Sequence, residues 1–345
     1  FELAEDTLWA KKGHIVGRDE VEVQAGDLLR WSRTGRSVAE IEETSSSFIL
    51  RCGGTTANVS KSSGTLSSLV VGAVSVLDDA AVDGIVSGPR LSCVRAFTDN
   101  DTGAGKHNTI RDQFYASGLS QMRYYPVRFK KDGNALISVV RAEGTRGCGW
   151  LHTRKWTIAE DGTLSIENRI EPHGKMPELP RIGTSWILDG SLTNVTWYGR
   201  GPHENYPDRA ESAFLGCYSS TVSQLYVQYA RPQDNGVRSD VRWIEFRDCE
   251  GRGVRFAASV PLCARALHYS WEDLEFARHR RRQERIFNVK PPRKEVCLDL
   301  DIAERGLGNA SCGPKTLPGY TVKNRIYEWT ETVRSVNKKG QEKTR

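Results

Sequence analysis

The segment Tyr198–Arg209 carries the densest set of chemically active side chains in this sequence. It reads Tyr-Gly-Arg-Gly-Pro-His-Glu-Asn-Tyr-Pro-Asp-Arg. Glycine permits unusual φ angles and proline removes a backbone donor, so this composition predicts an ordered loop and argues against a helix interior or a central strand. The preceding Leu192–Trp197 alternates apolar and polar residues, which predicts a strand. Because binding residues often lie in loops at strand ends, the segment is the first candidate for a functional site.

Two side chains of this segment, His203 and Glu204, have the chemistry of a general acid and a general base. They lie side by side in the sequence, on a loop rich in glycine and proline. Polar loop residues more often hold turns together. We therefore expect His203 and Glu204 to brace the loop through hydrogen bonds and an ion pair with Arg200 or Arg209.

Two further groups of polar residues could bind a cation or act as catalytic acids. Asp99, Asn100 and Asp101 offer the oxygen ligands that hard cations prefer, but one such trio is too small for a full site. An Asx-rich turn is the favoured interpretation. Glu42 and Glu43 are adjacent, and neighbouring side chains of a strand point to opposite faces, so the two carboxylates cannot act on one bond.

Composition excludes several classes of function. The net charge of +6 is modest, and the basic run His279–Arg285 lacks the interleaved aromatics typical of nucleic-acid sites. We expect this run to continue a solvated surface helix that begins at Trp271–Leu274, with no nucleic-acid partner. No run of eighteen apolar residues exists, so no membrane span is expected. The eight cysteines are scattered without metal-site spacing, which favours reduced, buried thiols in a cytoplasmic protein over disulfides.

The elements that must position these residues are strands. Three segments alternate most clearly and predict strands with one wet face: Thr163–Ile170, Val241–Arg247 and Glu295–Asp301. Three turn sequences predict hairpins between strand patterns: Lys131–Asn134, Glu160–Gly162 and Asp248–Gly251. Well over a dozen candidate strands and two short helices follow, so we predict an all-β protein built as a large antiparallel sandwich. Strands never alternate with long helices, which excludes a TIM barrel.

Five segments, in order, resemble the last domain of family 2 β-galactosidases, which is called the small chain. Trp197–Arg209 carries the first resemblance. The other four segments are Arg95–Asp101, where Phe97 replaces the usual proline, Tyr229–Gly236, Asp240–Trp243 and Arg305–Pro314. In addition, Asp6–His14 resembles the end of the immunoglobulin-like domain that precedes the small chain in the family.

The resemblance implies a galactose-mutarotase-like supersandwich and a division of the chain. Residues 1–28 would be the tail of an immunoglobulin-like β domain and residues 29–40 a linker. Residues 41–332 would form the supersandwich, and residues 333–345 a basic tail. Because the sequence opens on Phe1 and shows no signal-peptide pattern, we expect it to be a piece of a longer polypeptide, or a processed or partial one.

The resemblance also implies a function. The family hydrolyses terminal non-reducing β-D-galactose residues, as in lactose, with two glutamates of a barrel domain that this sequence lacks. No catalytic residue is therefore carried over, and this chain alone is expected to be inactive. No cofactor is expected here, whereas the complete enzyme would use magnesium and sodium. The implied partners are a galactoside and the large chain or upstream barrel, in an oligomer.

In the resembling enzymes, the loop after the closing segment reaches the active site, which implies substrate-binding roles for Cys312, Asn309 and Ser311. Some members place a tryptophan at the Cys312 position as a platform for the sugar. From the residues alone, this is a tight loop with a buried thiol. Two alternatives stay open: a stand-alone carbohydrate-binding or mutarotase-like module, in which a His and a Glu would exchange anomers, or an inactive fragment.

Overall fold

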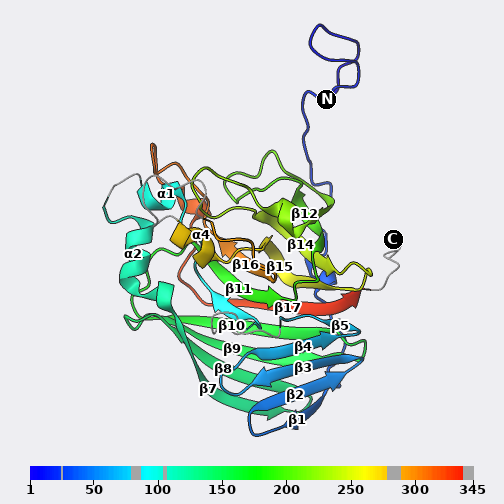
Figure 1. Ribbon diagram of the computed structural model, residues 1–345, viewed down its shortest axis with the longest axis vertical. Helices are drawn as coiled ribbons and strands as arrows, with labels where there is room; N and C mark the ends of the chain where they lie inside the picture. The colour runs from blue at the N-terminus through cyan, green and yellow to red at the C-terminus, as the bar shows by residue number, and fades with distance from the viewer. Residues whose placement is uncertain (25, 79–86, 104–106, 278–288, 337–345) are drawn as a thin grey trace.

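A computed structural model of the protein describes residues 1–24, 26–78, 87–103, 107–277 and 289–336 (Figure 1). Two β-sheets dominate it. In the smaller, five-stranded sheet, consecutive strands pair in chain order. Its strands are β1 (Glu40–Glu43), β2 (Ser47–Cys52), β3 (Thr55–Ser60), β4 (Leu66–Val71) and β5 (Val74–Ser75).

The larger sheet has twelve strands, and nine of them follow the order β13-β12-β14-β15-β17-β10-β9-β8-β7. Off this path, β16 pairs with β15, β11 with β16, and β6 with β11. The bounds are β6 (Arg90–Ser92), β7 (Arg123–Asp132), β8 (Ala135–Glu143), β9 (Gly149–Ile158), β10 (Leu164–His173), β11 (Arg181–Leu188), β12 (Asn194–Gly201), β13 (Phe214–Thr221), β14 (Arg238–Arg247), β15 (Gly253–Leu267), β16 (Val296–Glu304) and β17 (Tyr327–Val336). Every one of these pairings is antiparallel, which confirms the predicted fold class.

The fifteen-residue strand β15 explains how the large sheet divides. Its first part, Gly253–Ala258, pairs with β17, and its last part, Cys263–Leu267, pairs with β16. Two branches therefore leave β15 at different points along its length. The branch of β16, β11 and β6 lies beside the loops that form the site described below (Figure 1).

Short helices fill the connections. The α-helices in the described part of the chain are α1 (Asp99–Thr102), α2 (Ile110–Ser117), α3 (Val222–Leu225) and α4 (Trp271–Ala277), and the 3₁₀ turns are η1 (Leu28–Trp31), η4 (Leu119–Gln121) and η5 (Pro318–Tyr320). The helix predicted to begin near Trp271 is thus present as α4. Its predicted continuation through His279–Arg285 lies outside the described residues. None of these helices is long and apolar enough to span a membrane.

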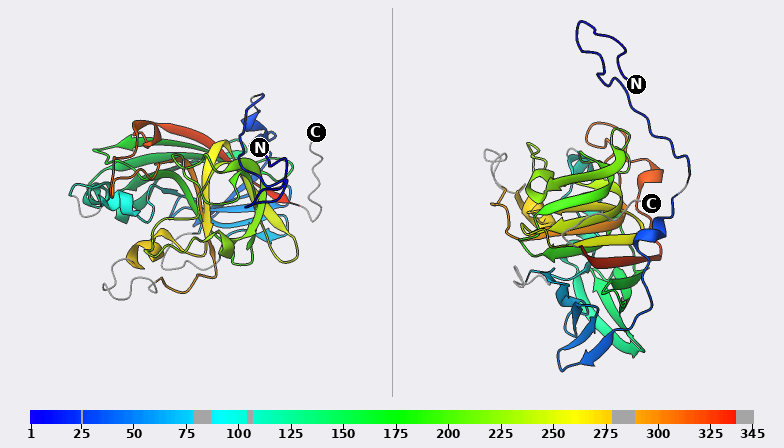
Figure 2. Two further views of the ribbon diagram at one scale, coloured as in Figure 1. Left: turned by 90° about the horizontal axis from the view of Figure 1, so that it is seen from above. Right: turned by 90° about the vertical axis from the view of Figure 1, so that its right-hand side faces the viewer.

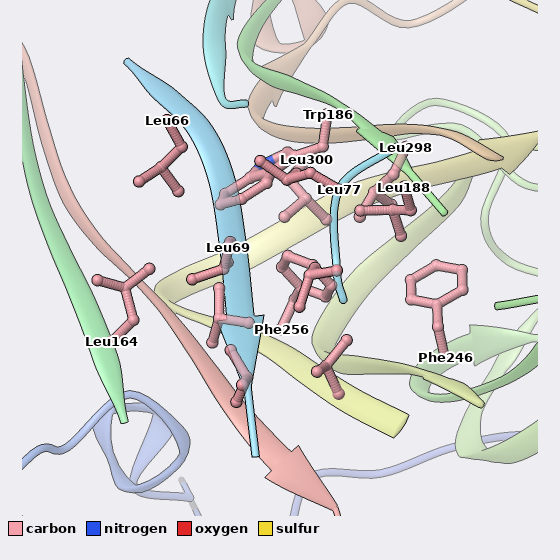
Figure 3. Close-up of a cluster of buried hydrophobic side chains, with 14 of the residues drawn as sticks. Leu66, Leu69, Leu77, Leu164, Trp186, Leu188, Phe246, Phe256, Leu298 and Leu300 are labelled. Atoms are coloured by element: carbon pink, nitrogen blue, oxygen red, sulfur yellow. The ribbon is translucent and has the colours of Figure 1, made fainter. Parts of the chain in front are cut away.

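The main hydrophobic core lies between the small sheet and the large one. Figure 3 shows Leu66 and Leu69 of β4 facing Leu164 of β10 and Phe256 of β15, and all four side chains are buried. At the far end of the small sheet, Phe48 packs on Phe129 with ring centroids 5.3 Å apart. Burying one such side chain stabilises the fold by roughly 1.5–3 kcal/mol.

The three predicted hairpins are confirmed. They join β7 to β8, β9 to β10, and β14 to β15. Gly133, Gly162 and Gly251 lie in these turns with φ angles of +60°, +81° and +79°. Only glycine adopts such angles without strain, so the turn sequences specify the hairpins directly.

Two predictions about strands are wrong. Tyr198–Gly201 is the end of β12 and does not belong to the loop; it pairs with β13 throughout and with β14 at Tyr198. A Cβ at Gly199 would lie 2.8 Å from the Val241 Cα atom, and one at Gly201 2.8 Å from the Tyr218 ring, so the glycines permit close packing in the sheet. In β16, the predicted wet face is also wrong, because Asp299 and Asp301 are buried.

Residues 1–17 stand away from both sheets (Figures 1 and 2). Phe1–Gly17 folds back on itself, with a β-bridge between Glu2 and Ile15. The chain then touches the body through Glu20, whose side chain accepts a hydrogen bond from the Leu215 amide at 2.9 Å. The assignment of residues 1–28 to a preceding immunoglobulin-like domain stays a prediction.

Candidate functional site

The candidate site is built around the closing loop, residues Gly306–Pro314, which follows β16. The loop makes its own turn, since the Cys312 and Gly313 amides both donate to the Asn309 carbonyl, at 3.0 and 2.6 Å. The Asn309 amide in turn donates to the Pro314 carbonyl at 3.1 Å. Gly308 has a φ of +61°, and a Cβ there would lie 2.6 Å from the Thr316 Oγ1 atom. The loop is therefore a compact turn with a defined shape.

Asp208 of the candidate segment Tyr198–Arg209 holds one side of the closing loop. Its Oδ1 accepts from the Leu307 amide at 2.8 Å, and its Oδ2 accepts from the Gly308 amide at 2.7 Å. A Cβ at Gly306 would lie 2.4 Å from the Asp208 Cγ atom, so only glycine allows the carboxylate to come this close. One aspartate thus fixes two successive amides of the loop.

Asn100 of α1 holds the other side. Its Nδ2 donates to the Gly308 carbonyl at 2.6 Å, while its Oδ1 accepts from the Ser311 amide at 3.0 Å and the Ser311 hydroxyl at 2.7 Å. The residue is positioned by α1, which begins with a capping box between Thr98 and Asp101. Both hydrogen-bonding ends of the Asn100 amide are therefore committed to the closing loop.

The three predicted substrate-binding residues lie together on this loop. Cys312 and Asn309 are exposed, and Ser311 is half-buried with its polar groups bonded to Asn100. The expectation of a buried thiol, drawn from the residues alone, is wrong for Cys312. A tight four-residue turn at the surface leaves no neighbouring layer to cover the sulfur. Contact of these residues with a substrate stays a prediction.

The expected bracing role of Glu204 is confirmed. Its carboxylate pairs with the Arg209 guanidinium at 2.7 Å, accepts from the Gly236 amide at 2.8 Å and is bonded by the Tyr229 hydroxyl. His203 is exposed, and its Nε2 lies 3.0 Å from the Ser212 Oγ atom. The two side chains thus have separate surroundings, which does not favour a cooperating acid and base.

The next two residues anchor the same segment to the body. Asn205 is fully buried, and its Oδ1 accepts from the Ser239 amide at 2.9 Å and the Ser239 hydroxyl at 2.5 Å. The Tyr206 hydroxyl donates to the Asp234 carboxylate at 2.8 Å. These bonds fix the backbone that carries Asp208 to the closing loop.

Asp99, Asn100 and Asp101 are part of a short helix, which corrects the predicted Asx-rich turn. The capping box satisfies the first amides and so allows a helical turn to form here. The three side chains have different partners: Asp99 pairs with Arg231 at 2.7 Å, and Asp101 pairs with Arg95 at 3.0 Å. They do not converge on one cation. Glu42 and Glu43 are likewise engaged, with Arg51 and Lys61, both at 2.7 Å.

Beneath the site lies a buried ionic network of three arginines and five acids. Its members are Arg95, Arg181, Arg265, Asp101, Asp234, Asp299, Asp301 and Glu304. Asp299 accepts from Arg265 Nε at 2.8 Å and lies 3.0 Å from Arg181 Nη1. Arg95 forms a bidentate pair with Asp101 and also donates to the Arg305 carbonyl at 2.8 Å. The network therefore links β11, β15 and β16 to α1 and to the start of the closing loop.

The acids of this network outnumber its arginines, and their pKa values shift in opposite directions. Burial acts to raise the pKa of Asp299, but Arg181 and Arg265 hold that pKa below its usual range. Burial raises the pKa of Asp301 to about 7, and burial together with Asp234 raises the pKa of Glu304 well above its ordinary value. Burial thus favours the protonated forms of Asp301 and Glu304, whereas Arg181 and Arg265 favour the charged form of Asp299.

The arrangement of the buried ionic network indicates a structural role. A cavity of about 30 Å³ lies beside Arg265 and Asp299, which is the share of a single water molecule. Across the described residues, no group of three or more His, Cys, Asp or Glu side chains could hold a metal ion. All eight cysteines are free, and Cys93, Cys148 and Cys297 are buried, whereas Cys217, Cys249 and Cys312 are exposed. Exposure of these three corrects the expectation that the thiols are buried.

Comparison with known proteins gives a consistent result. The family described as "Beta galactosidase small chain" matches residues 51–332. A β-galactosidase of Priestia megaterium is 29% identical over 334 residues, which cover 96% of this chain and 31% of the relative. A β-galactosidase of Aeromonas hydrophila is 27% identical over 340 residues, which cover 95% of this chain and 31% of the relative. The chain thus spans just under a third of the length of these relatives.

Solved structures show a more distant likeness. The galactose 1-epimerase of Lactobacillus acidophilus aligns with 87% of this chain and 99% of its own, at 9% identity and a TM-score of 0.44. The identity and the TM-score are both low, so no functional residue can be carried over from it.

Proposed function

Because the chain belongs to the β-galactosidase small-chain family, we propose that it is the part of a β-galactosidase that completes the galactoside pocket. The complete enzyme would hydrolyse terminal β-D-galactose residues. Its two catalytic glutamates would come from a barrel domain, supplied by a large chain or by an upstream part of one long polypeptide. The limited coverage of the relatives supports this division, since about two thirds of their length has no counterpart here.

One observation carries the proposal: the closing loop is clamped on both sides and still presents exposed side chains. Asp208 and Asn100 make five hydrogen bonds to Leu307, Gly308 and Ser311, while Cys312 and Asn309 face solvent. A loop held this firmly costs little further ordering when a ligand binds, which favours a role in binding over one as a connector. Cys312 would then contribute a small apolar edge to the sugar pocket.

The chemistry of bond cleavage would belong to the rest of the enzyme. Retaining glycosidases place two carboxyl groups about 5–5.5 Å apart on either side of the bond. In this chain, Glu204 is committed to Arg209, and the acids of the buried ionic network have no access to a sugar. Magnesium and sodium, if used, would likewise be held outside this chain, so no step of the proposal involves them.

Co-expression with a candidate large chain tests the proposal. The purified chain alone should not turn over a chromogenic galactoside, and the assembled pair should. A matched control pairs the large chain with the Gly306→Val variant, in which a side chain would collide with Asp208 and displace the closing loop. Turnover by the isolated chain, after contaminating enzyme is removed, would contradict the proposal, as would full activity of the large chain without its partner. Tight galactose binding by the isolated chain would instead support a stand-alone module.

A further inference from the structure

A pocket lies behind the closing loop, on the side of α1 and α2. Its walls include Asn100 and Asp101 of α1, Ile110 of α2, Leu307 and Ala310 of the closing loop, and Arg305. The cavity volume is about 90 Å³. At about 30 Å³ per water molecule, that is room for roughly three waters, well below the roughly 300–1,000 Å³ of drug-sized ligand pockets. The pocket therefore suits a small ion or molecule and is too small for a sugar ring.

Arg305 is the unusual member of this wall. The residue is 2% exposed, yet its Nε and Nη1 atoms make no hydrogen bond to the described part of the chain. Nη1 lies 3.0 Å from a Glu178 carboxylate oxygen without hydrogen-bonding geometry, and the Glu178 side chain is 53% exposed. Buried guanidinium groups normally satisfy their donors, because each unmet donor costs free energy. Nε therefore has no acceptor in the described part of the chain, and Nη1 has only its ion pair with Glu178.

The charges around the pocket favour an anion. Both carboxylate oxygens of Asp101 are already bonded to Arg95, so Asp101 adds no net negative charge to the pocket wall. Glu178 offsets one positive charge, and Lys315 adds another. The imidazole of His107 supplies a further polar group. Among the described wall residues, the remaining charge is positive, and Asp208 acts on Arg305 from outside the wall. The Arg305 guanidinium is planar, and such a group binds carboxylate and phosphate oxygens.

We propose that this pocket binds a small oxyanion, phosphate or carboxylate, against Arg305 and Lys315. The anion would touch Leu307 and Ala310 from behind and lie beside Asn100, which clamps the same loop. Its binding would therefore stabilise the closing loop. The binding step is a property of this chain alone, and only an effect on galactoside turnover rests on the function proposed above.

Calorimetric titration of the chain with inorganic phosphate, and separately with acetate, tests the proposal at constant ionic strength with chloride as the background anion. Binding of phosphate or acetate supports an oxyanion site, and the stronger of the two identifies the group that the pocket prefers. The bound anion should also slow hydrogen exchange of the Ser311 amide. If neither anion binds more tightly than chloride, the proposal is wrong.

Three variants assign the binding to the pocket. Arg305→Gln removes the buried guanidinium and should weaken binding about tenfold or more, as expected for a charge-assisted hydrogen bond. Lys315→Gln should weaken binding a few-fold. Because it changes only an exposed side chain, it can still test the proposal if Arg305→Gln does not fold. Lys323→Gln is the matched control, because Lys323 is exposed and bonds to Pro318 and Thr321 outside the pocket. Equal affinities in all four proteins would overturn the assignment.

Discussion

Replacing Asn100 by alanine should release the closing loop while leaving the sheets intact. The substitution removes three hydrogen bonds, one to the Gly308 carbonyl and two from Ser311. The two bonds from Asp208 and the internal turn of the loop remain. The loop should therefore open more often without unfolding the domain.

The size of the effect follows from the surroundings of the lost bonds. A hydrogen bond contributes about 0.5–1.5 kcal/mol net, so three bonds give an upper limit of about 4.5 kcal/mol. Ser311 is only half-buried, so water replaces part of what is lost. We expect a cost of about 1.5–2 kcal/mol in the free energy of local opening, which corresponds to roughly 10- to 30-fold faster exchange of the Ser311 amide.

Hydrogen exchange resolved to single amides measures this directly on the isolated chain. Asn309→Ala is the matched control, since Asn309 is an asparagine of the same loop whose side chain makes no hydrogen bond to the described residues. The Gly308 amide is an internal reference, because it donates to Asp208 in all variants. If Ser311 exchanges no faster in Asn100→Ala than in Asn309→Ala, the clamp described here does not hold the loop.

Three further predictions test other parts of the structure. Burial raises the pKa of Glu331 to about 7 from 4.5, so the folded state retains a proton that the unfolded state releases. Glu331 should then lower the free energy of unfolding by up to about 3 kcal/mol as pH rises from about 4.5 to 7. Glu331→Gln should remove this share, so urea unfolding at pH 5 and 8 should show a smaller fall in stability than in the unsubstituted chain, where Asp301 also contributes. An unchanged pH dependence would contradict this role of Glu331. A Cβ at Gly183 would lie 2.2 Å from the Leu300 carbonyl oxygen, so Gly183→Ala should destabilise the protein by about 1–3 kcal/mol, whereas Gly319→Ala, which meets no atom within 4 Å, should leave the melting temperature almost unchanged. In the assembled enzyme, Cys312→Trp should change KM a few-fold to tenfold without lowering the melting temperature, and unchanged kinetics in both Cys312→Trp and Cys312→Ala would refute a role in binding.

The features that the sequence predicted well are local ones. Each confirmed hairpin depends on a glycine, such as Gly133 or Gly162, whose left-handed φ is required by the turn itself. The bracing of Glu204 by Arg209 is also local, since the two residues are five positions apart. In these cases, the residues that determine the structure are neighbours in the chain.

Features that depend on distant partners were missed. Gly199 and Gly201 resemble loop residues until Val241 and Tyr218, which come from neighbouring strands, explain why side chains are excluded there. The alternation of β16 suggested solvent on its polar face. In fact, Arg181 forms ion pairs with Asp299 and Asp301, and Arg265 forms one with Asp299. No pattern in the sequence indicates these pairs.

In the candidate site, too, contacts between distant residues were missed. The closing loop was located by a family resemblance, but neither Asp208 nor Asn100 was identified as its holder. Asp208 belongs to a segment already selected for its polar side chains, and Asn100 to an acidic trio considered for cations. A signal was therefore present in both places, but only the structure shows that both residues reach the same loop.

The clamp on the closing loop also sets an order of events during folding. Asp208 bonds to Leu307 and Gly308, which lie 99 and 100 positions further along the chain. Asn100 bonds to Gly308 and Ser311, which lie 208 and 211 positions further along. Contacts between such distant residues form slowly, because a long stretch of chain must first be brought together. Hairpins such as β7–β8 need no such search. During synthesis, the loop also leaves the ribosome after nearly all of the sheet strands. The closing loop should therefore be among the last parts to become ordered. Native-like sheet content measured early in refolding would not yet indicate that the candidate site has formed.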